Sequence, residues 1–220
     1  MKIAVVAGAS GLVGKQLMFK LLESKLYSNI IVLVRNPIPI KHPLLQQVKV
    51  NYDQLENYKE ELKGDDYYCC LGTTMKKAGS RQEFYKVDFT YCLSFAKVAE
   101  TNAATSFSII SAVGADPSSS IYYSQVKGKL EEELKKLRFK RLHIFHPSLL
   151  MGNRLELRIG EVIGSVFAKI VSPLMFGSLA KFKPIESTQL ADALLNIAQL
   201  DHLTRINYWT YGNMINYFKN

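Results

Sequence analysis

Residues 1–14 read Met-Lys-Ile-Ala-Val-Val-Ala-Gly-Ala-Ser-Gly-Leu-Val-Gly, with glycine at positions 8, 11 and 14. The apolar run before Gly8 is typical of a buried β-strand, and the apolar residues from Leu12 to Leu22 recur with helical spacing. Glycine can adopt the positive φ that a tight turn requires. The sequence therefore predicts a strand, a glycine-rich turn and a helix, in that order.

This order is the one in which a glycine-rich turn can bind a dinucleotide. Gly8 allows the tight turn, Gly11 lets the backbone approach a pyrophosphate, and Gly14 lets the helix pack closely against the strand. The first amides of the helix then face the anion, and the helix dipole adds to the attraction. We therefore predict a dinucleotide site, the alternative being a turn that only joins the two elements.

Length and cysteine usage narrow the class of protein. A chain of 220 residues with 48% hydrophobic side chains suits a single α/β domain over 1–220. Cys69, Cys70 and Cys92 form no Cys-x-x-Cys pair, so we expect no metal site and no disulfide framework, only small buried side chains. Such cysteines fit a reducing environment, so we expect a cytoplasmic location. Because the first strand begins at the N-terminus, we also expect no signal or transit peptide.

The formal net charge of +9 raises the question of nucleic-acid binding. The lysines are scattered, and the densest charged run, Glu131 to Arg141, mixes both signs as a solvated helix face does. We therefore expect no nucleic-acid partner, and a basic surface that attracts a polyanionic cofactor instead. The apolar stretch from Ile159 to Leu179 contains Glu161, Lys169 and Pro173, which argues against a membrane span.

Alternating strands and helices predict the fold class. Strands are expected at residues 29–34, 47–50, 67–71, 107–112 and 142–145, and helices at 53–61 (capped by Asp53), 80–99 and 120–137. Such alternation indicates an α/β, Rossmann-type doubly wound parallel sheet. Residues 151–220 are expected to form a small C-terminal extension on the substrate side. It would hold a helical apolar stripe from Ile159 to Val171, a helix at 186–200 and a last strand at 207–211.

Arg35 follows the second predicted strand, and no Asp or Glu occupies positions 34–36. In dinucleotide-binding folds this position faces the adenine ribose, where an acid binds the 2′-hydroxyl of NAD and an arginine can pair with the 2′-phosphate of NADP. The sequence therefore favours NADP(H) over NAD. The alternative is an ordinary exposed arginine at the end of a strand.

Tyr123 and Lys127 are the candidate catalytic pair. At a spacing of four they share one helix face, whereas the residue four after Tyr122 is Val126. A neighbouring ammonium stabilises a phenolate, so the tyrosine can act as an acid towards a carbonyl or as a base towards an alcohol. Ser111, at the end of the preceding strand, could orient a substrate carbonyl. Alternatively, the pair belongs to a solvated helix face and the serine is an ordinary strand end.

These features together resemble the short-chain dehydrogenase/reductase superfamily, and more narrowly its atypical branch around the NADPH-binding Tat-interacting protein and its bacterial relatives. The similarity covers most of residues 1–161. The residues that carry it are Cys69-Cys70-Leu71-Gly72-Thr73-Thr74, Lys77-Ala78-Gly79-Ser80, Val87-Asp88, Ser111, Gly114-Ala115-Asp116, Tyr123 to Gly128, Pro147 to Leu150 and Arg154 to Glu161.

The resemblance implies which residues bind NADP(H) along the carboxyl edge of the sheet. The pyrophosphate would be held by the glycine loop, the 2′-phosphate by Arg35, and the nicotinamide side by the segments after two later strands. The implied cofactor residues are Gly8, Ser10, Gly11, Leu12, Val13, Arg35, Asn51, Tyr52, Leu71, Gly72, Thr73, Thr74, Tyr123, Lys127, Pro147, Ser148, Leu149 and Leu150. The implied catalytic residues are Ser111, Tyr123 and Lys127.

Two positions depart from the family pattern. The family has two serines where this chain has Ser111-Ala112, so either Ser111 or an absent second serine corresponds to the catalytic hydroxyl. His146 stands where the family has arginine before proline. The sequence thus predicts an NADPH-dependent reductase of a small carbonyl compound, as a monomer or homodimer. The alternatives are an NADPH-binding regulatory module with a protein partner, or a site for a nucleoside or sugar nucleotide.

Overall fold

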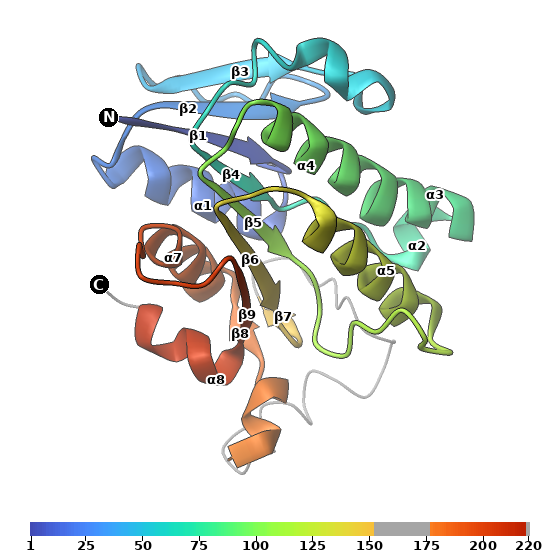
Figure 1. Cartoon of the computed structure of the whole chain (residues 1–220). Helices are drawn as coiled ribbons and strands as arrows, with labels where there is room; N and C mark the ends of the chain where they lie inside the picture. The colour runs from blue at the N-terminus through green and yellow to red at the C-terminus, as the bar shows by residue number, and fades with distance from the viewer. Residues whose placement is uncertain (152–176, 219–220) are drawn as a thin grey trace.

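The glycine-rich turn joins strand β1 (Lys2–Ala7) to helix α1 (Leu12–Glu23), as predicted. In the computed structural model, which describes residues 1–151 and 177–218, β1 is an inner strand of a seven-stranded sheet with the order β3-β2-β1-β4-β5-β6-β9. Every neighbouring pair of strands is parallel (Figure 1). The other six strands are β2 (Tyr27–Val34), β3 (Leu45–Lys49), β4 (Asp66–Cys69), β5 (Ser106–Ile110), β6 (Arg141–His146) and β9 (Ile206–Thr210).

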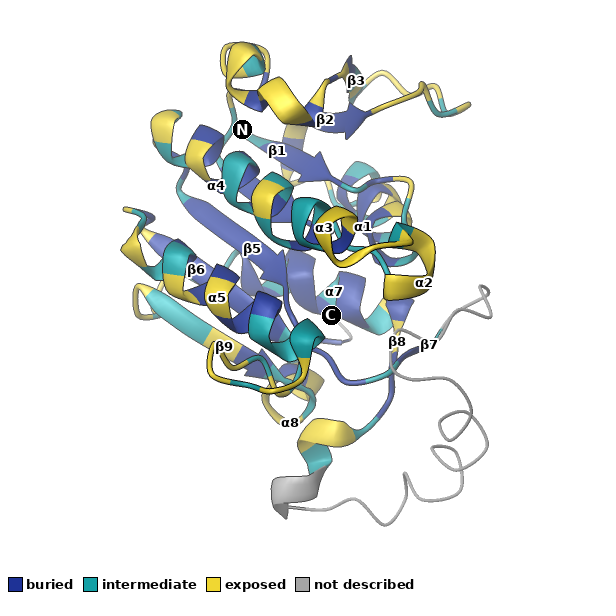
Figure 2. Ribbon diagram, turned by 90° about the vertical axis from the view of Figure 1, so that its right-hand side faces the viewer, coloured by how far each residue is buried: buried dark blue, intermediate teal, exposed yellow. Residues whose placement is uncertain are grey.

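Helices cover both faces of this sheet, which confirms the predicted doubly wound Rossmann-type fold (Figures 1 and 2). Helices α1 and α7 (Ser187–Ile197) pack against one face, and α4 (Tyr91–Thr101) and α5 (Tyr122–Lys136) against the other. The shorter described elements are α2 (Met75–Ala78), α3 (Arg81–Tyr85), α8 (Tyr211–Met214) and the strand pair β7 (Leu150–Met151) and β8 (Ile185–Glu186).

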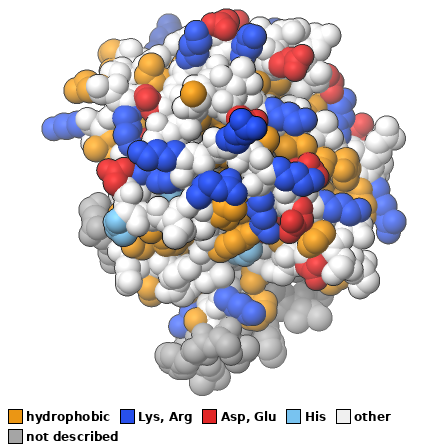
Figure 3. Space-filling model, viewed as in Figure 1, with side chains coloured by type: hydrophobic (Ala, Val, Ile, Leu, Met, Phe, Trp, Pro, Cys, Tyr) orange, Lys and Arg blue, Asp and Glu red, His pale blue; other side chains and the backbone are white. Residues whose placement is uncertain are grey.

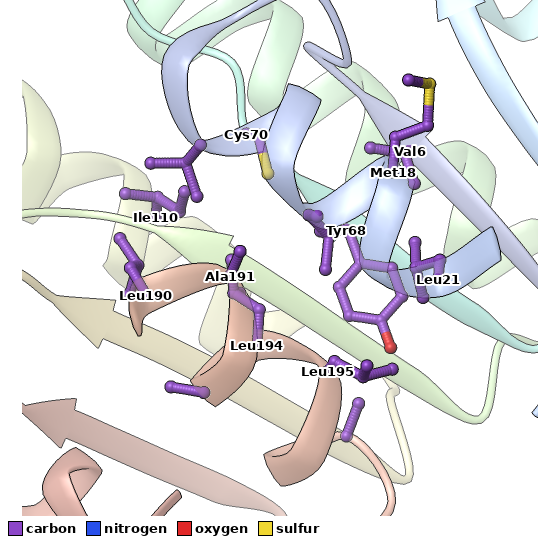
Figure 4. Close-up of a cluster of buried hydrophobic side chains, with 14 of the residues drawn as sticks. Val6, Met18, Leu21, Tyr68, Cys70, Ile110, Leu190, Ala191, Leu194 and Leu195 are labelled. Atoms are coloured by element: carbon purple, nitrogen blue, oxygen red, sulfur yellow. The ribbon is translucent and has the colours of Figure 1, made fainter. Parts of the chain in front are cut away.

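The strands read as continuous apolar runs because both faces of the sheet are buried. Successive residues alternate between the faces, so that Tyr67 belongs to the α4–α5 side and Tyr68 to the α1–α7 side. Figure 4 shows the second side, where Val6 and Ile110 of the sheet lie with Leu194 of α7 in the same cluster. The helices therefore keep the strand ends in place on both sides of the site.

The strand order reverses between β1 and β4, because the chain leaves β3 at one edge and returns to the other side of β1. At such a switch point the loops that follow the two strands diverge, and they leave a crevice at the carboxyl ends of the strands. The loops after Ala7 and after Cys69 flank this crevice.

Two predicted helices differ from the structure. Residues Tyr52–Tyr58 form a 3₁₀ segment rather than a longer helix, and Asn51 caps it in place of Asp53. The predicted helix over 80–99 is broken into α3, a π-helical turn over Lys86–Thr90 and α4. The propensity pattern is helical throughout this region, but the π turn adds a residue and brings Asp88 into the interior.

The remaining elements agree with the predictions to within three residues at either end. Cys69, Cys70 and Cys92 are buried, as expected. The predicted strand at 207–211 is β9, which pairs with β6, and the predicted helix at 186–200 is α7. The apolar stripe from Ile159 to Val171 lies outside the described residues. No helix within residues 1–151 or 177–218 has the length and apolar character needed to cross a bilayer.

Candidate functional site

A cleft of about 620 Å³ opens at the switch point, within the size range of ligand pockets. Of the residues predicted to bind a cofactor, the cleft is lined by Gly8, Ser10, Gly11, Arg35, Tyr52, Leu71, Gly72 and Thr73. It is also lined by residues that the sequence reasoning missed, namely Leu33, Val34, Asn36, Cys70, Lys77, Ala78, Glu83, Val87 and Tyr91. Four of these, Lys77, Ala78, Glu83 and Tyr91, belong to α2, α3 and α4, whose approach to the glycine loop depends on tertiary packing.

The glycine loop is held tightly against its neighbours. Gly8 has a φ of +86°, and a Cβ there would lie 2.7 Å from the carbonyl oxygen of Cys70. A Cβ on Gly14 would lie 2.2 Å from the oxygen of Gly8, and the Gly11 N–H donates to that same oxygen at 2.9 Å. The two Cβ distances are too short for any side chain, so glycine at positions 8 and 14 is what allows this loop to pass between β4 and α1.

The N-terminus of α1 is suited to an anion. Gly11 occupies the cap position and offers no side-chain acceptor, and the first turn contains no acidic residue. The first N–H groups of a helix lack partners within the helix, and the dipole adds partial positive charge. Val13 is buried and Leu12 packs against the same core, so these two residues can reach a ligand through their backbone. The loop and helix therefore fit the phosphates of a dinucleotide.

Arg35 is exposed at the end of β2 and lines the cleft. Tyr52 lines the same wall but is buried, and burial raises its pKa well above the ordinary value while the charge of Arg35 acts to lower it. The Tyr52 hydroxyl is therefore neutral at physiological pH. Asn51 is exposed and is not part of the lining, and its Oδ1 accepts the Asp53 N–H at 3.0 Å.

A second tyrosine, Tyr91 of α4, gives this end of the cleft an aromatic character. The ring centroids of Tyr52 and Tyr91 are 5.2 Å apart. The Tyr91 hydroxyl donates to Asp53 at 3.1 Å, and Lys86 forms an ion pair with Asp53 at 2.9 Å. These contacts tie the 52–58 segment to α4. No spacing in the sequence indicates them, because the partners are more than 30 residues apart.

Lys127 lies inside the protein rather than on a solvated helix face. Its side chain is 1% exposed, and its Nζ lies 2.7 Å from Oδ1 of Asp88, whose side chain is 2% exposed. Burial acts to lower the pKa of Lys127, but the Asp88 carboxylate, with Tyr123, outweighs burial and raises it. The other Asp88 oxygen accepts the backbone N–H of Thr73 at 2.7 Å. Lys127 is therefore a buried ammonium beside the wall of the cleft.

Tyr123 is half-buried one helical turn before Lys127, and its ring centroid lies 5.7 Å from that of Phe84. Tyr122 is used differently, since its hydroxyl donates to the backbone oxygen of Arg81 at 3.0 Å. The structure thus brings together the predicted pair and separates Tyr122 from it. Neither Tyr123 nor Lys127 belongs to the lining of the cleft. Thr73, which is linked to Lys127 through Asp88, does belong to it.

Ser111 is 2% exposed, and its hydroxyl donates to Oε1 of Glu131 on α5. His146 Nε2 lies 2.9 Å from the same oxygen. The Ser111 hydroxyl therefore belongs to a buried polar cluster and does not line the cleft. Orientation of a substrate by Ser111 requires that its bond to Glu131 be exchanged for one to the substrate.

The predicted segments on the nicotinamide side are both anchored by polar contacts. Thr74 caps α2 by accepting the Lys77 N–H at 3.1 Å. Pro147 is buried and its oxygen accepts the Val113 N–H at 3.0 Å, while the Ser148 hydroxyl donates to the Lys183 carbonyl. Leu149 precedes β7, whose first residue is Leu150. This segment does not line the cleft, so its contact with a cofactor stays a prediction.

The same Rossmann-type fold occurs in solved structures of proteins that bind NAD or NADPH. Solved structures with this fold include the Bordetella bronchiseptica enzyme WbmH in complex with NAD⁺, with a TM-score of 0.69 and 15% identity over 95% of this chain and 75% of that one. The human epimerase family protein SDR39U1 with NADPH has a TM-score of 0.61 and 16% identity, over 94% of this chain and 74% of that one.

Sequence comparison shows the family. The rat protein HTATIP2 is 36% identical over 182 residues, which cover 81% of this chain and 72% of that protein. The mitochondrial protein FMP52 of Candida albicans is 28% identical over 201 residues, which cover 88% and 86%. No family model matches the chain. The chain belongs to the HTATIP2 family, which confirms the resemblance carried by its motifs.

The predicted cytoplasmic location is contradicted by these relatives. Several of them, from Candida albicans, Eremothecium gossypii and Debaryomyces hansenii, are named as mitochondrial proteins. The prediction depended in part on cysteines whose spacing indicates no disulfide framework. Free thiols indicate a reducing environment but do not identify the compartment that provides it.

Proposed function

We propose that this protein binds NADP(H) in the cleft and reduces a small carbonyl compound. The observation that carries the proposal is the buried Lys127 ammonium, which is joined through Asp88 to Thr73 on the cleft wall. Arg35, which lines the same cleft and has no acid at the neighbouring positions 34 and 36, supports NADP(H) over NAD.

NADPH, when bound, supplies the hydride that the carbonyl carbon accepts. Tyr123 donates its hydroxyl proton to the carbonyl oxygen, and the Lys127 ammonium stabilises the phenolate that remains. Asp88 keeps Lys127 charged in an environment that otherwise favours the neutral amine. The glycine loop and the N-terminus of α1 hold the pyrophosphate, and Arg35 pairs with the 2′-phosphate.

Calorimetric titration with NADPH, NADP and NADH tests this proposal on the wild type and on Arg35→Ala. We expect submillimolar binding of NADPH, at least roughly tenfold weaker binding of NADH, and loss of this preference in Arg35→Ala. Arg138→Ala, which removes an exposed arginine near the end of α5, is the matched control and should keep the preference. Absence of dinucleotide binding would mean that the glycine loop is structural, and the oxidoreductase proposal would be dropped.

A second candidate is an NADPH-binding regulatory module with little catalysis. The observation that favours it is the bond of Ser111 to Glu131, together with alanine at position 112. Both features leave the substrate without an obvious serine hydroxyl. NADPH oxidation measured across a panel of aldehydes and ketones separates the two candidates, because only the first predicts turnover.

A further inference from the structure

Lys77 is a cation in the lining of the cleft, and the proposed function gives it no part. It is the third residue of α2, and its side chain is exposed. Among the described residues, the charged side chains of the lining are Arg35, Lys77 and Glu83. Because Arg35 is assigned to the 2′-phosphate, Lys77 is the cation of this lining that is left to act on another part of the ligand.

The backbone of Lys77 is fixed at both ends of α2. The Thr74 hydroxyl caps the helix by accepting the Lys77 N–H at 3.1 Å. At the other end, Gly79 has a φ of +75° and its N–H donates to the Met75 oxygen at 3.0 Å. Successive side chains leave a helix at roughly 100° to one another. Lys77 consequently lines the cleft, whereas the neighbouring Lys76 does not.

The glycine loop offers a pyrophosphate no side-chain charge. The residues of the loop that line the cleft are Gly8, Ser10 and Gly11, which are all neutral. Lys15 of α1 is exposed and lies outside the lining. Each phosphate of a pyrophosphate bridge is negatively charged, whereas a helix N-terminus supplies only about half a positive charge. A cation from another element is therefore needed to balance the bridge.

Positive charge alone does not distinguish Lys77 from other lysines. Lysine and arginine side chains are spread over the face of the molecule shown in Figure 3, and acidic side chains lie between them. What distinguishes Lys77 is that it lines one cleft together with the glycine loop. A lysine ammonium on its flexible stem can reach a phosphate as a point charge.

We infer that Lys77 pairs with the pyrophosphate of the bound dinucleotide and makes the cleft selective for a dinucleotide over a mononucleotide. The backbone amides of the loop and of α1 bind the bridge from one element, and the Lys77 ammonium binds it from α2. This inference rests on the proposed function and adds a specificity-determining residue to it.

The test compares NADPH with adenosine 2′-monophosphate, which carries the adenine, its ribose and the 2′-phosphate but no pyrophosphate. In Lys77→Met, we expect calorimetry to show roughly tenfold weaker binding of NADPH, and binding of the mononucleotide within about twofold of the wild type. Lys77→Arg keeps the charge and should retain most of the NADPH affinity. Lys76→Met removes a neighbouring exposed charge outside the lining and should change neither affinity.

Two results with Lys77→Met would overturn the inference. Equal weakening of both ligands would assign Lys77 to the 2′-phosphate or to the local fold. Unchanged affinity for both would remove Lys77 from the site, and the proposed function would still stand. If the wild type binds no NADPH, the proposed function itself fails.

Acetylation of the wild type gives a second readout that needs no variant. Lys76 and Lys77 are both exposed, so mass spectrometry can compare their rates of modification by an amine-acylating reagent. We expect saturating NADPH to slow the modification of Lys77 severalfold and to leave Lys76 unchanged, and adenosine 2′-monophosphate to protect neither. Equal protection of the two lysines by NADPH, or protection of neither, would contradict the pairing of Lys77 with the pyrophosphate.

Discussion

The Ser111 hydroxyl donates a hydrogen bond to the Glu131 carboxylate, and the two residues are 2% and 5% exposed. Glu131 lies one helical turn after Lys127 on α5. The serine at the end of β5 therefore contacts the helix that carries the candidate catalytic pair, and it does not face the cleft. This arrangement makes the role of Ser111 directly testable.

Ser111→Ala should act on stability more than on cofactor binding. The substitution removes one donor from a buried carboxylate that retains His146, and we expect a loss of about 1 kcal/mol in the free energy of unfolding by urea. NADPH affinity should not change. Ser108→Ala is the control, because the buried Ser108 hydroxyl has no hydrogen-bond partner among the described residues, and its removal should cost less. A loss of turnover at unchanged stability would instead assign Ser111 to the substrate.

Gly8→Ala should both destabilise the protein and abolish dinucleotide binding. Alanine at this position would have to adopt a φ of +86°, which L residues disfavour, and its Cβ would lie 2.7 Å from the Cys70 carbonyl. The loop would therefore have to move. Gly114→Ala is a matched control, since Gly114 has a φ of +79° but no atom within 4 Å of the added Cβ. It should show only the backbone strain, about 1–2 kcal/mol by thermal or chemical unfolding. Equal effects of the two substitutions on NADPH binding would contradict the tight fit around Gly8.

Tyr123→Phe should separate binding from chemistry. The phenylalanine ring preserves the contact with Phe84, so NADPH affinity should stay within about twofold. Turnover on a carbonyl substrate should fall at least roughly a hundredfold, because the proton donor is lost. Tyr122→Phe, which removes only the hydroxyl bound to the Arg81 backbone, should retain turnover. Full activity of Tyr123→Phe would exclude the tyrosine as the acid.

His143 should make the protein less stable in mild acid. Burial, and then the charge of Arg141, lowers the pKa of His143 to about 4, against about 6.5 in the unfolded chain. Between these values the unfolded state binds the extra proton, so this contribution is complete above about pH 6.5 and is lost as the pH falls towards 4. The full loss is about 3 kcal/mol.

Urea unfolding between about pH 7.5 and 4.5 measures this effect. His143→Gln keeps an acceptor for the Trp209 indole N–H, which donates to His143 at 3.3 Å, and removes the titrating group. Its stability should depend less steeply on pH than that of the wild type. His202→Gln, at an exposed position, should follow the wild type. Parallel curves for all three proteins would show that His143 is not the titrating group.

Much of the fold could be predicted from local pattern. The apolar runs around Val5 and Val32 identify buried parallel strands, and the glycine spacing identifies the turn, because a positive φ and close backbone approach depend on residues only a few positions apart. The breaks at residues 53 and 86 could not be predicted. Their local propensities are helical, and the departures depend on contacts of Asp53 and Asp88 with distant elements.

The residues of the candidate site also fall into those that the sequence predicts and those that only the tertiary structure brings together. The sequence by itself determined the glycine loop, Arg35 and the Tyr123–Lys127 spacing, since each lies at the end of a strand or on one helix face. Only the tertiary structure decided that Asp88 meets Lys127, that Glu131 binds Ser111, and that Tyr91 faces Tyr52. These contacts join residues 20 to 39 positions apart, because their elements pack on a common sheet. Periodicity within one element carries no information about which side chains of another will face it.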